Sequence, residues 1–432
     1  MMRNRKHPQQ SESKAWKTLF LVSFINSAQT SLAVVGIPSH VVQTEMSQAQ
    51  LGLLLGAMPL FAGLSAFCSG FLSDFLGRKS LLIAGLALLG TSLSLHAFAS
   101  SFPILLTLRS FTGLSTGIIM GLPSALLSDS YPTSRQQTLT GKTLCGYAIG
   151  QTIGIPIGIL FMDWTDFLLL CSLLGFFTLL VIPLARAYVP STQTQIPRKN
   201  KWASTYLKLA RSTIRDPQFA LVSCNSFLSF MALSIFYVTF ALWLFDTAKL
   251  RPAEVAPMYL GAGILQIIVF AYLVQLTAKL NVRTTIATSL LVNSLLFATA
   301  YLAFQSLTSA AVLFALTLAT VSARIPGLQF LMNNCGEAPQ KGLRISIVQT
   351  CGHIGKAIGS VAASFLFTRI EAHQTLLICS GITLICCILF ITPVFLETNS
   401  AQASTKTEQK QKLGLGEVPD NSRKKWLWHA RC

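Results

Sequence analysis

Three basic side chains stand inside long apolar runs of this chain of 432 residues. Arg109, Arg324 and Lys356 would each lie within a bilayer, where an unpaired charge costs at least ~2.5–3.5 kcal/mol. Gln349 and His353 precede Lys356 by seven and three residues, so the three form one polar stripe on a helix. We expect this stripe to line a hydrated cavity, although the histidine could instead satisfy a backbone carbonyl. Arg109 and Arg324 could instead extend their side chains to the membrane surface.

Acidic residues are missing from the middle of every apolar run. All fifteen Asp and Glu residues can be placed in loops, tails or run ends. The polar residues of the first and seventh runs are neutral. The predicted substrate-binding residues are Asn26, Gln29, Arg109, Asn225, Ser229, Arg324, Gln349, His353 and Lys356. A cavity with these residues carries net positive charge, which favours a substrate with a carboxylate, a phosphate or another anionic group over a cationic drug.

Catalytic and metal-binding patterns do not occur. The ten cysteines form no CxxC pair, no HExxH or G-x-S-x-G is present, and Gly141-Lys142-Thr143 lacks the glycine that a phosphate-binding loop needs five positions earlier. We therefore predict no enzyme activity, no metal site and no cofactor. Coupling to a proton or another ion stays open. His353 or Lys356 could carry a proton, or the anion itself could be exchanged or co-transported.

Composition indicates which elements must position these residues. Only 11% of the residues are charged, 52% are hydrophobic and the mean hydropathy is +0.58, which excludes an ordinary soluble enzyme. The chain is predicted to be an all-α integral membrane protein with twelve transmembrane helices. The expected spans are residues 17–38, 51–72, 80–99, 103–128, 142–161, 166–187, 217–243, 255–276, 284–305, 308–331, 343–367 and 374–396.

Basic residues fix the predicted orientation. If both termini are cytoplasmic, 27 Lys and Arg residues fall on the cytoplasmic side and three on the other side, as the positive-inside rule requires. The same rule explains the net charge of +18, so no nucleic-acid partner is expected. We predict a multi-pass protein of the inner or plasma membrane with both termini in the cytoplasm.

The spans divide into two related groups of six. The predicted organisation is a basic tail (1–16), a six-helix bundle (17–187), a basic linker (188–216), a second six-helix bundle (217–396) and a disordered tail (397–432). Gly150 and Gly355 are 205 residues apart, as are Arg78 and Arg283. Such internal repetition is typical of transporters built from two related halves.

The loop between the second and third spans reads Gly-Phe-Leu-Ser-Asp-Phe-Leu-Gly-Arg-Lys from residue 70. It closely resembles the G-x-L-x-D-x-x-G-R-K signature of the major facilitator superfamily. Arg109 with Gly113, and Pro132 with Arg135, resemble further motifs of that family. The resemblance covers about residues 17–396. It implies two pseudo-symmetric six-helix bundles around a central cavity lined by spans 1, 4, 7 and 10, with spans 2, 5, 8 and 11 as gates.

The resemblance also implies a conformational latch and a gate. The latch would consist of Gly70, Asp74, Gly77, Arg78 and Lys79. Span five resembles the glycine and proline motif of drug–proton antiporters, but Ile155 interrupts the pattern. The predicted gate-packing residues are Gly146, Gly150, Gly154, Pro156 and Gly158, with Gly355 and Gly359 in span eleven. Gly146, Gly150, Gly154 and Gly158 are spaced four residues apart and form one smooth helix face, which we call the glycine ladder. From the spacing alone, this face could let two helices slide along each other or could serve only static packing.

These observations predict a secondary active transporter, without catalytic residues, that moves a small anionic or zwitterionic organic solute by alternating access. The span-five pattern slightly favours efflux by an antiporter. Uptake of an organic acid or phosphate ester stays open, as does a sensor that binds solute without transporting it. The expected partners are a small-molecule substrate and the lipid bilayer, and a monomer is expected.

Overall fold

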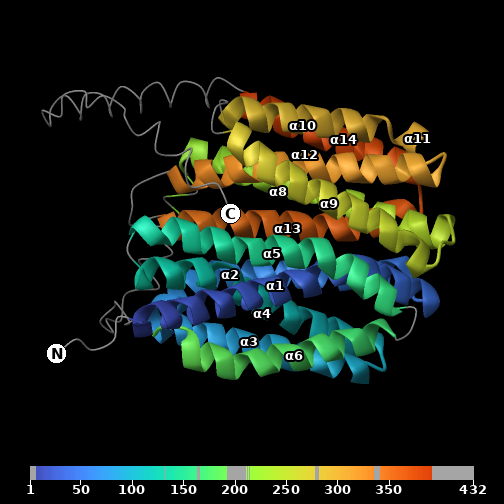
Figure 1. Ribbon diagram of the computed structural model, residues 1–432. Coiled ribbons are helices and arrows are strands. Elements are labelled where there is room, and N and C mark those ends of the chain that lie inside the picture. The colour runs from blue at the N-terminus through green and yellow to red at the C-terminus, as the bar shows by residue number, and fades with distance from the viewer. Residues whose placement is uncertain are drawn as a thin grey trace, which may run out of the picture.

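The computed structural model describes residues 6–131, 133–162, 166–191, 211, 213, 215–277, 282–334 and 341–391 (Figure 1). The N-terminal half contains α1 (Lys6–Gln43), α2 (Gln48–Leu76), α3 (Arg78–Ser94), η1 (Leu95–Phe98), α4 (Phe102–Ser130), α5 (Thr133–Met162) and α6 (Phe167–Tyr188). The C-terminal half contains α8 (Pro217–Leu242), η2 (Trp243–Thr247), α9 (Pro252–Thr277), α10 (Val282–Ala298), α11 (Ala300–Ala303), α12 (Leu307–Asn334), α13 (Lys341–Phe367) and α14 (Ala372–Ile391). The described residues contain no strand, and the predicted all-α fold is confirmed.

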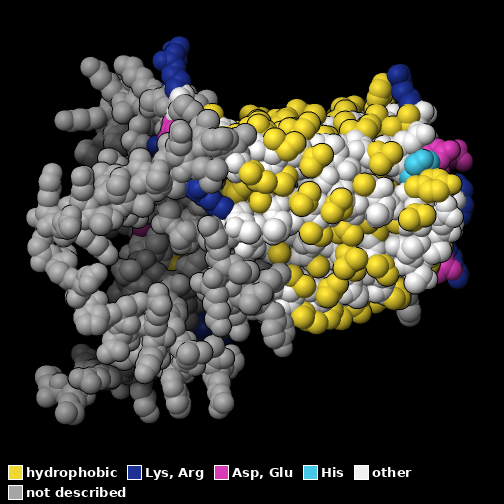
Figure 2. All heavy atoms as spheres, turned by 90° about the horizontal axis from the view of Figure 1, so that it is seen from above, with side chains coloured by type: hydrophobic (Ala, Val, Ile, Leu, Met, Phe, Trp, Pro, Cys, Tyr) yellow, Lys and Arg dark blue, Asp and Glu magenta, His cyan; other side chains and the backbone are white. Residues whose placement is uncertain are grey.

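The described residues form twelve long helices, and the short segments η1, η2 and α11 extend α3, α8 and α10. The helices run side by side as one bundle (Figure 1). We call the end where α1 begins and α14 ends the near end, and the opposite end the far end. Nine helices among the described residues are long and apolar enough to cross a bilayer. In Figure 2 the Lys, Arg, Asp and Glu side chains that are coloured lie toward the two ends, with an apolar and neutral band between them. Such a band fits a bilayer core.

Local sequence explains where individual helices begin. Ser47 starts α2 with a capping box, in which its hydroxyl accepts from the Gln50 amide at 3.3 Å and its own amide donates to Gln50 Oε1 at 2.9 Å. α1 begins at Lys6, so the helix starts before the predicted membrane span of residues 17–38. Pro8 is compatible with this start because a proline in the first helical turn removes no internal hydrogen bond.

The two halves repeat one packing scheme. In the N-terminal half α1 packs on α5, α2 on α4 and α3 on α6; in the C-terminal half α8 packs on α13, α9 on α12 and α10 on α14. The first helix of each half therefore packs on the fifth, and the second on the fourth. Two extended contacts join the halves, α2 with α13 and α5 with α9. The predicted gate helices, spans 2, 5, 8 and 11, are thus the ones that meet between the halves.

Aromatic rings fill the C-terminal half at its far end. Phe236 of α8 lies 5.6 Å from Phe240, 5.2 Å from Phe297 and 5.8 Å from Phe314, measured between ring centroids. Phe297 belongs to α10 and Phe314 to α12, so the cluster ties three helices together. Rings of this size contribute much of the buried area of a core.

Candidate functional site

α13 contacts two neighbouring helices, α8 and α2, through two different faces. Gly355 and Gly359 approach the carbonyl oxygens of Phe227 and Met231 in α8, whereas Ala357 and Val361 lie against α2. At ~100° of rotation per residue, Lys356 and Gln349 fall in the sector between these two faces. α8 belongs to the C-terminal half and α2 to the N-terminal half, so this sector faces the space between the halves.

Lys356 is held in this sector by its neighbours. Its Nζ lies 4.6 Å from the centroid of the Phe230 ring in α8, a cation–π contact. Ser234 of α8 donates a hydrogen bond of 2.9 Å to the Lys356 carbonyl, and Ser360 donates one of 3.0 Å. No ion pair joins Lys356 to an acid within the described part of the chain. The ammonium group therefore keeps donors free for a ligand.

The acidic side chains that the structure describes all lie at helix ends or in loops. They are Glu45, Asp129, Asp166, Asp216, Asp246, Glu254 and Glu371. Lys356 is the sixteenth residue of the 27-residue helix α13, and so lies close to the middle of the bundle. The described middle of the bundle therefore carries basic side chains without a compensating carboxylate.

His353 lies on the face of α13 that contacts α2. Its Cβ is 3.0 Å from the position that a Cβ would occupy on Gly63, and Thr350 donates a hydrogen bond of 3.0 Å to the Gly63 carbonyl. His353 is buried, and its Nδ1 has no hydrogen-bond partner among the described residues. The stripe Gln349–His353–Lys356 thus runs from the contact between the halves into the sector beside it.

Asn26 and Gln29 are buried in α1. Gln29 Nε2 donates to the Thr116 hydroxyl of α4 at 2.9 Å, which fixes this amide within the N-terminal half. The side-chain oxygens of Asn26 and Gln29 find no hydrogen-bond partner among the described residues. Two acceptors in the N-terminal half therefore stay available.

Arg109 does not extend to the membrane surface. It is 2% exposed in α4 and donates to the sulfur of Met58 in α2 at 3.2 Å, while its Nε has no partner among the described residues. Arg109 is therefore enclosed within the N-terminal half near its far end, apart from the Lys356 stripe.

Asn225 and Ser229 of α8 form part of the packing of the C-terminal half. Asn225 donates to the Cys386 carbonyl of α14 at 3.0 Å, and Ser229 donates to Asn225 Oδ1 at 3.3 Å. Arg324 of α12 is 5% exposed, and its Nη1 has no partner among the described residues. Arg324 is therefore buried in protein and does not reach the membrane surface.

Two tyrosines of the C-terminal half were not predicted from the sequence. The Tyr237 ring of α8 lies 6.1 Å from the Phe314 ring of α12, and the Tyr259 ring of α9 lies 4.7 Å from the same Phe314. The Tyr259 hydroxyl is buried and has no hydrogen-bond partner among the described residues. The one sequence signal was the seven-residue spacing of Phe230 and Tyr237, which places both on one face of α8.

The latch loop is described in part. Gly77 has φ 84°, a conformation that L-residues with a side chain rarely adopt, and it separates α2 from α3. Arg78 forms an ion pair of 3.1 Å with Asp129 and donates to the Ala125 carbonyl of α4 at 2.7 Å. Lys79 donates to the Arg186 carbonyl at 2.7 Å. Gly70 lies inside α2, and the Asp74 side chain is outside the described part of the chain.

The predicted gate glycines pack inside each half. Cβ atoms added at Gly146 and Gly150 of α5 would meet the carbonyl oxygens of Phe20 and Phe24 in α1, and Gly154 and Gly158 continue this face along Ala28 and Leu32. Gly355 and Gly359 contact α8 in the same way. Pro156 is buried in α5. The ladders therefore hold together the first and fifth helices of each half, and their role in gating stays a prediction.

Other glycines carry the contact between the halves. Gly52 and Gly56 of α2 lie against Ser364 and Ala357 of α13, and Gly263 of α9 lies against Thr152 of α5. The sequence analysis did not single out these glycines, although Gly52 and Gly56 have the four-residue spacing of a helix-packing face.

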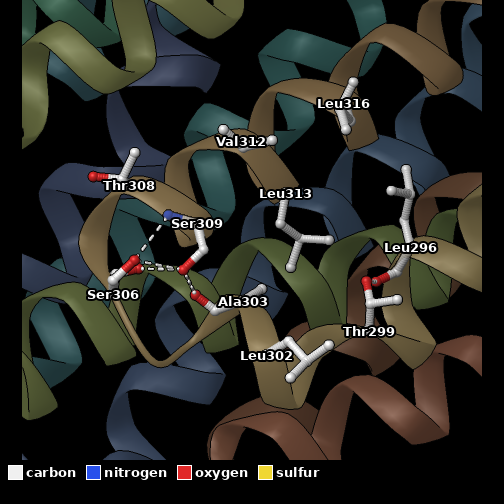
Figure 3. A pocket seen from close by; sticks show the side chains of 10 residues that line it. All are labelled: Leu296, Thr299, Leu302, Ala303, Ser306, Thr308, Ser309, Val312, Leu313 and Leu316. Carbon is white, nitrogen blue, oxygen red and sulfur yellow. Dashed lines mark hydrogen bonds between the residues drawn. The ribbon is translucent and has the colours of Figure 1, made fainter.

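A separate pocket lies at the far end, between α10, α11 and α12 (Figure 3). Its lining is uncharged and consists of Leu296, Thr299, Leu302, Ala303, Ser306, Thr308, Ser309, Val312, Leu313 and Leu316. The hydroxyls of Ser306 and Ser309 are 2.7 Å apart, and Ser309 donates to the Ala303 carbonyl. None of the predicted substrate-binding residues lines this pocket.

Comparisons with known proteins agree with this architecture. The family model of the Major Facilitator Superfamily matches residues 19–292 and 222–430. The uncharacterized MFS-type transporter YceJ of Bacillus subtilis is 26% identical over 383 residues, which cover 86% of this chain and 93% of YceJ. The crystal structure of the human organic anion transporter MFSD10 superposes with a TM-score of 0.65 at 19% identity, covering 88% of this chain and 99% of that one.

One relative matches more closely over a shorter region. The 4-hydroxybenzoate transporter PcaK of Pseudomonas aeruginosa is 30% identical over 162 residues, which cover 36% of this chain and 35% of PcaK. The chain thus matches about a third of that relative's length. With the family model covering most of the chain and the helices arranged in two repeated halves, this protein belongs to the Major Facilitator Superfamily of membrane transporters.

Proposed function

We propose that this protein is a secondary transporter that moves a small organic anion by alternating access and binds it between the halves at Lys356. The observation that carries the proposal is the position of this ammonium group. It lies near the middle of the bundle, over the Phe230 ring, with no acidic partner among the described residues. An unpaired charge within a membrane span is costly and points to a functional role.

The surroundings of Lys356 favour an anion that carries an aromatic ring. The Phe230 face provides an apolar surface beside the cation, so a carboxylate could bind Nζ while its ring packs on Phe230. Arg324 adds a second buried cation in the same half. The names of two similar proteins, a 4-hydroxybenzoate transporter and an organic anion transporter, specify organic anions and support this substrate class.

Ligand binding to the purified protein tests the substrate class. We expect benzoate to bind the full-length protein in detergent, and Lys356→Gln to weaken this binding at least tenfold because the charged hydrogen bond to the carboxylate is lost. Lys249→Gln is the matched control, since Lys249 is exposed at the far end beside Asp246. Unchanged affinity in Lys356→Gln, or preference for lipophilic cations over anions, would contradict the proposal.

Counterflow in proteoliposomes separates a transporter from a sensor. Vesicles loaded with unlabelled benzoate should accumulate labelled benzoate against its gradient, whereas a sensor would bind the anion without flux. An imposed pH gradient in the same vesicles tests proton coupling.

We further propose that the near end faces the cytoplasm, in the inner or plasma membrane. Among the described residues, most Lys and Arg lie at that end, for example Arg78, Lys79 and Arg186, whereas Lys249, Arg251 and Arg369 lie at the far end. Export is the direction that the glycine and proline pattern of α5 favours. Cells that produce the protein should then accumulate less labelled benzoate than cells without it. Greater accumulation would establish uptake.

A further inference from the structure

Gly352 of α13 leaves room for the aromatic ring that holds Lys356. A Cβ added at Gly352 would lie 2.6 Å from Cδ2 and 3.0 Å from Cε2 of Phe230 in α8, so the ring would have to move. The same ring lies 4.6 Å, measured from its centroid, from the Lys356 Nζ. Gly352 and Lys356 are one helical turn apart, ~6 Å along the axis of α13. The Phe230 ring therefore lies against both residues.

The internal repeat does not account for this glycine. Gly146 of α5 corresponds to Cys351, which lies 205 residues later, so Gly352 is an additional glycine. An added Cβ at Gly146 would meet a backbone carbonyl oxygen of α1. At Gly352 the nearest atoms belong to side chains, the Phe230 ring and the Ser226 hydroxyl, which is 3.0 Å away. Packing of the two backbones therefore does not require a glycine here, whereas the position of the ring does.

The ring and the ammonium group are both accessible to a ligand. Phe230 and Lys356 are half-buried, whereas Gly352 beneath the ring is buried. The lysine stem is flexible, and ordering it when an anion binds would cost conformational entropy. A ring that already holds the ammonium group lowers this cost, because the cation is in place before the anion arrives.

We propose that Gly352 is a positioning residue of the anion site, which seats the Phe230 ring against α13 so that the ring holds the Lys356 ammonium group in place for the substrate. The inference rests on the proposed function and deepens it, since it assigns the geometry of the binding cation to an uncharged residue that does not touch the substrate. A side chain at this position would push the ring away from α13. The ammonium group would then lose its support, and the apolar surface beside it would move.

A double-mutant cycle between Gly352 and Phe230 tests this assignment. The dissociation constant of benzoate is measured for the full-length protein in detergent and for its Gly352→Ala, Phe230→Leu and double variants. Gly352→Ala and Phe230→Leu should each weaken binding at least about fivefold, because a desolvated cation–π contact contributes roughly this much. In the Phe230→Leu background, which has no ring to displace, Gly352→Ala should change the constant less than about twofold, since its effect acts through the ring.

Gly90→Ala is the matched control. Its added Cβ would meet Leu179 Cδ2 at 2.6 Å, the same distance as at Gly352, but between α3 and α6 of the other half. This variant should bind benzoate within about twofold of the wild type, because distant sites act independently. Thermal unfolding of each variant confirms folding.

The outcomes separate the two proposals. The positioning role is overturned if Gly352→Ala binds benzoate as the wild type does, if it weakens binding by the same factor with and without the Phe230 ring, or if Gly90→Ala weakens binding equally. Unchanged affinity in Phe230→Leu also overturns it, even where Gly352→Ala does not fold. Lys356→Gln in the same assay tests the proposed function. If the wild type does not bind benzoate, or Lys356→Gln binds it equally well, the proposed function fails and the inference fails with it.

Discussion

Gly77 determines the turn between α2 and α3. Its φ of 84° lies in a region that a Cβ makes unfavourable, and the residue both ends one helix and precedes the next. Directly after it, Arg78 reaches Asp129 and the Ala125 carbonyl at the near end of α4. The backbone conformation of Gly77 therefore determines where α3 starts and where Arg78 and Lys79 are placed.

Gly77→Ala should lower the free energy of unfolding by ~1–2 kcal/mol, since alanine must adopt the same positive φ. Thermal unfolding in detergent measures the change. Gly121→Ala is the control, because Gly121 lies in helix α4 with φ in the ordinary range and open space around its Cα. A loss of the same size in both variants would show that the backbone conformation is not the cause.

Residue identity alone predicted the charged part of the site. Lys356 is conspicuous in an apolar run, and the structure does place it between the faces that contact α2 and α8. Tyrosines are as common in packed helices as in binding sites, and Tyr237 and Tyr259 lie beside the same Phe314 ring only because α8, α9 and α12 converge. Arg109 and Asn225 were predicted from polarity, and the side-chain hydrogen bond that the structure gives each of them stays within its own half.

At the scale of helices, the glycine ladders explain why each half packs as one body. Gly150 of α5 and Gly355 of α13 are 205 residues apart, and each lets a carbonyl of the first helix of its half approach closely. The repeat seen in the sequence is thus a repeat of one helix–helix contact. Sequence spacing identified the small residues, but their partner helix could not be predicted because either neighbour of α5 would accept such a face.

Gly150→Ala should destabilise the protein by ~1–3 kcal/mol, because the added methyl group meets the Phe24 carbonyl oxygen at a contact with little room to relax. Gly141→Ala in the same helix has no atom within 4 Å of the added group and should show no loss. Thermal unfolding of both variants gives the comparison. Equal stability of the two would mean that α1 can move away from α5 at little cost.

At the scale of the molecule, the halves touch along α2 and α13, which are neighbours at Gly52 and Ser364 near the far end. The hydrophobic runs predicted the number and approximate bounds of the helices, and the resemblance predicted which helices meet. The arrangement of the halves depends on contacts between residues up to 312 positions apart, such as this one. No local pattern specifies such contacts.

The double variant Gly52→Cys with Ser364→Cys should form a disulfide under mild oxidation, since the two Cβ positions are 3.1 Å apart and a small adjustment gives disulfide geometry. Closing the far end permanently should reduce counterflow at least tenfold, and a reductant should restore it. Each single variant serves as a control for the native cysteines. Full flux in the cross-linked protein would show that this contact does not open during transport.

Trp243 is the first residue of η2, the segment that meets α1 of the other half, and its indole lies 4.8 Å from the Phe304 ring and 6.2 Å from the Phe240 ring. If the far end opens, water reaches this ring, and indole emission moves to longer wavelength in a wetter environment. The difference between the wild-type and Trp243→Phe spectra would isolate that signal. The protein thus carries a built-in optical reporter, with which the kinetics of opening can be followed without attaching a dye.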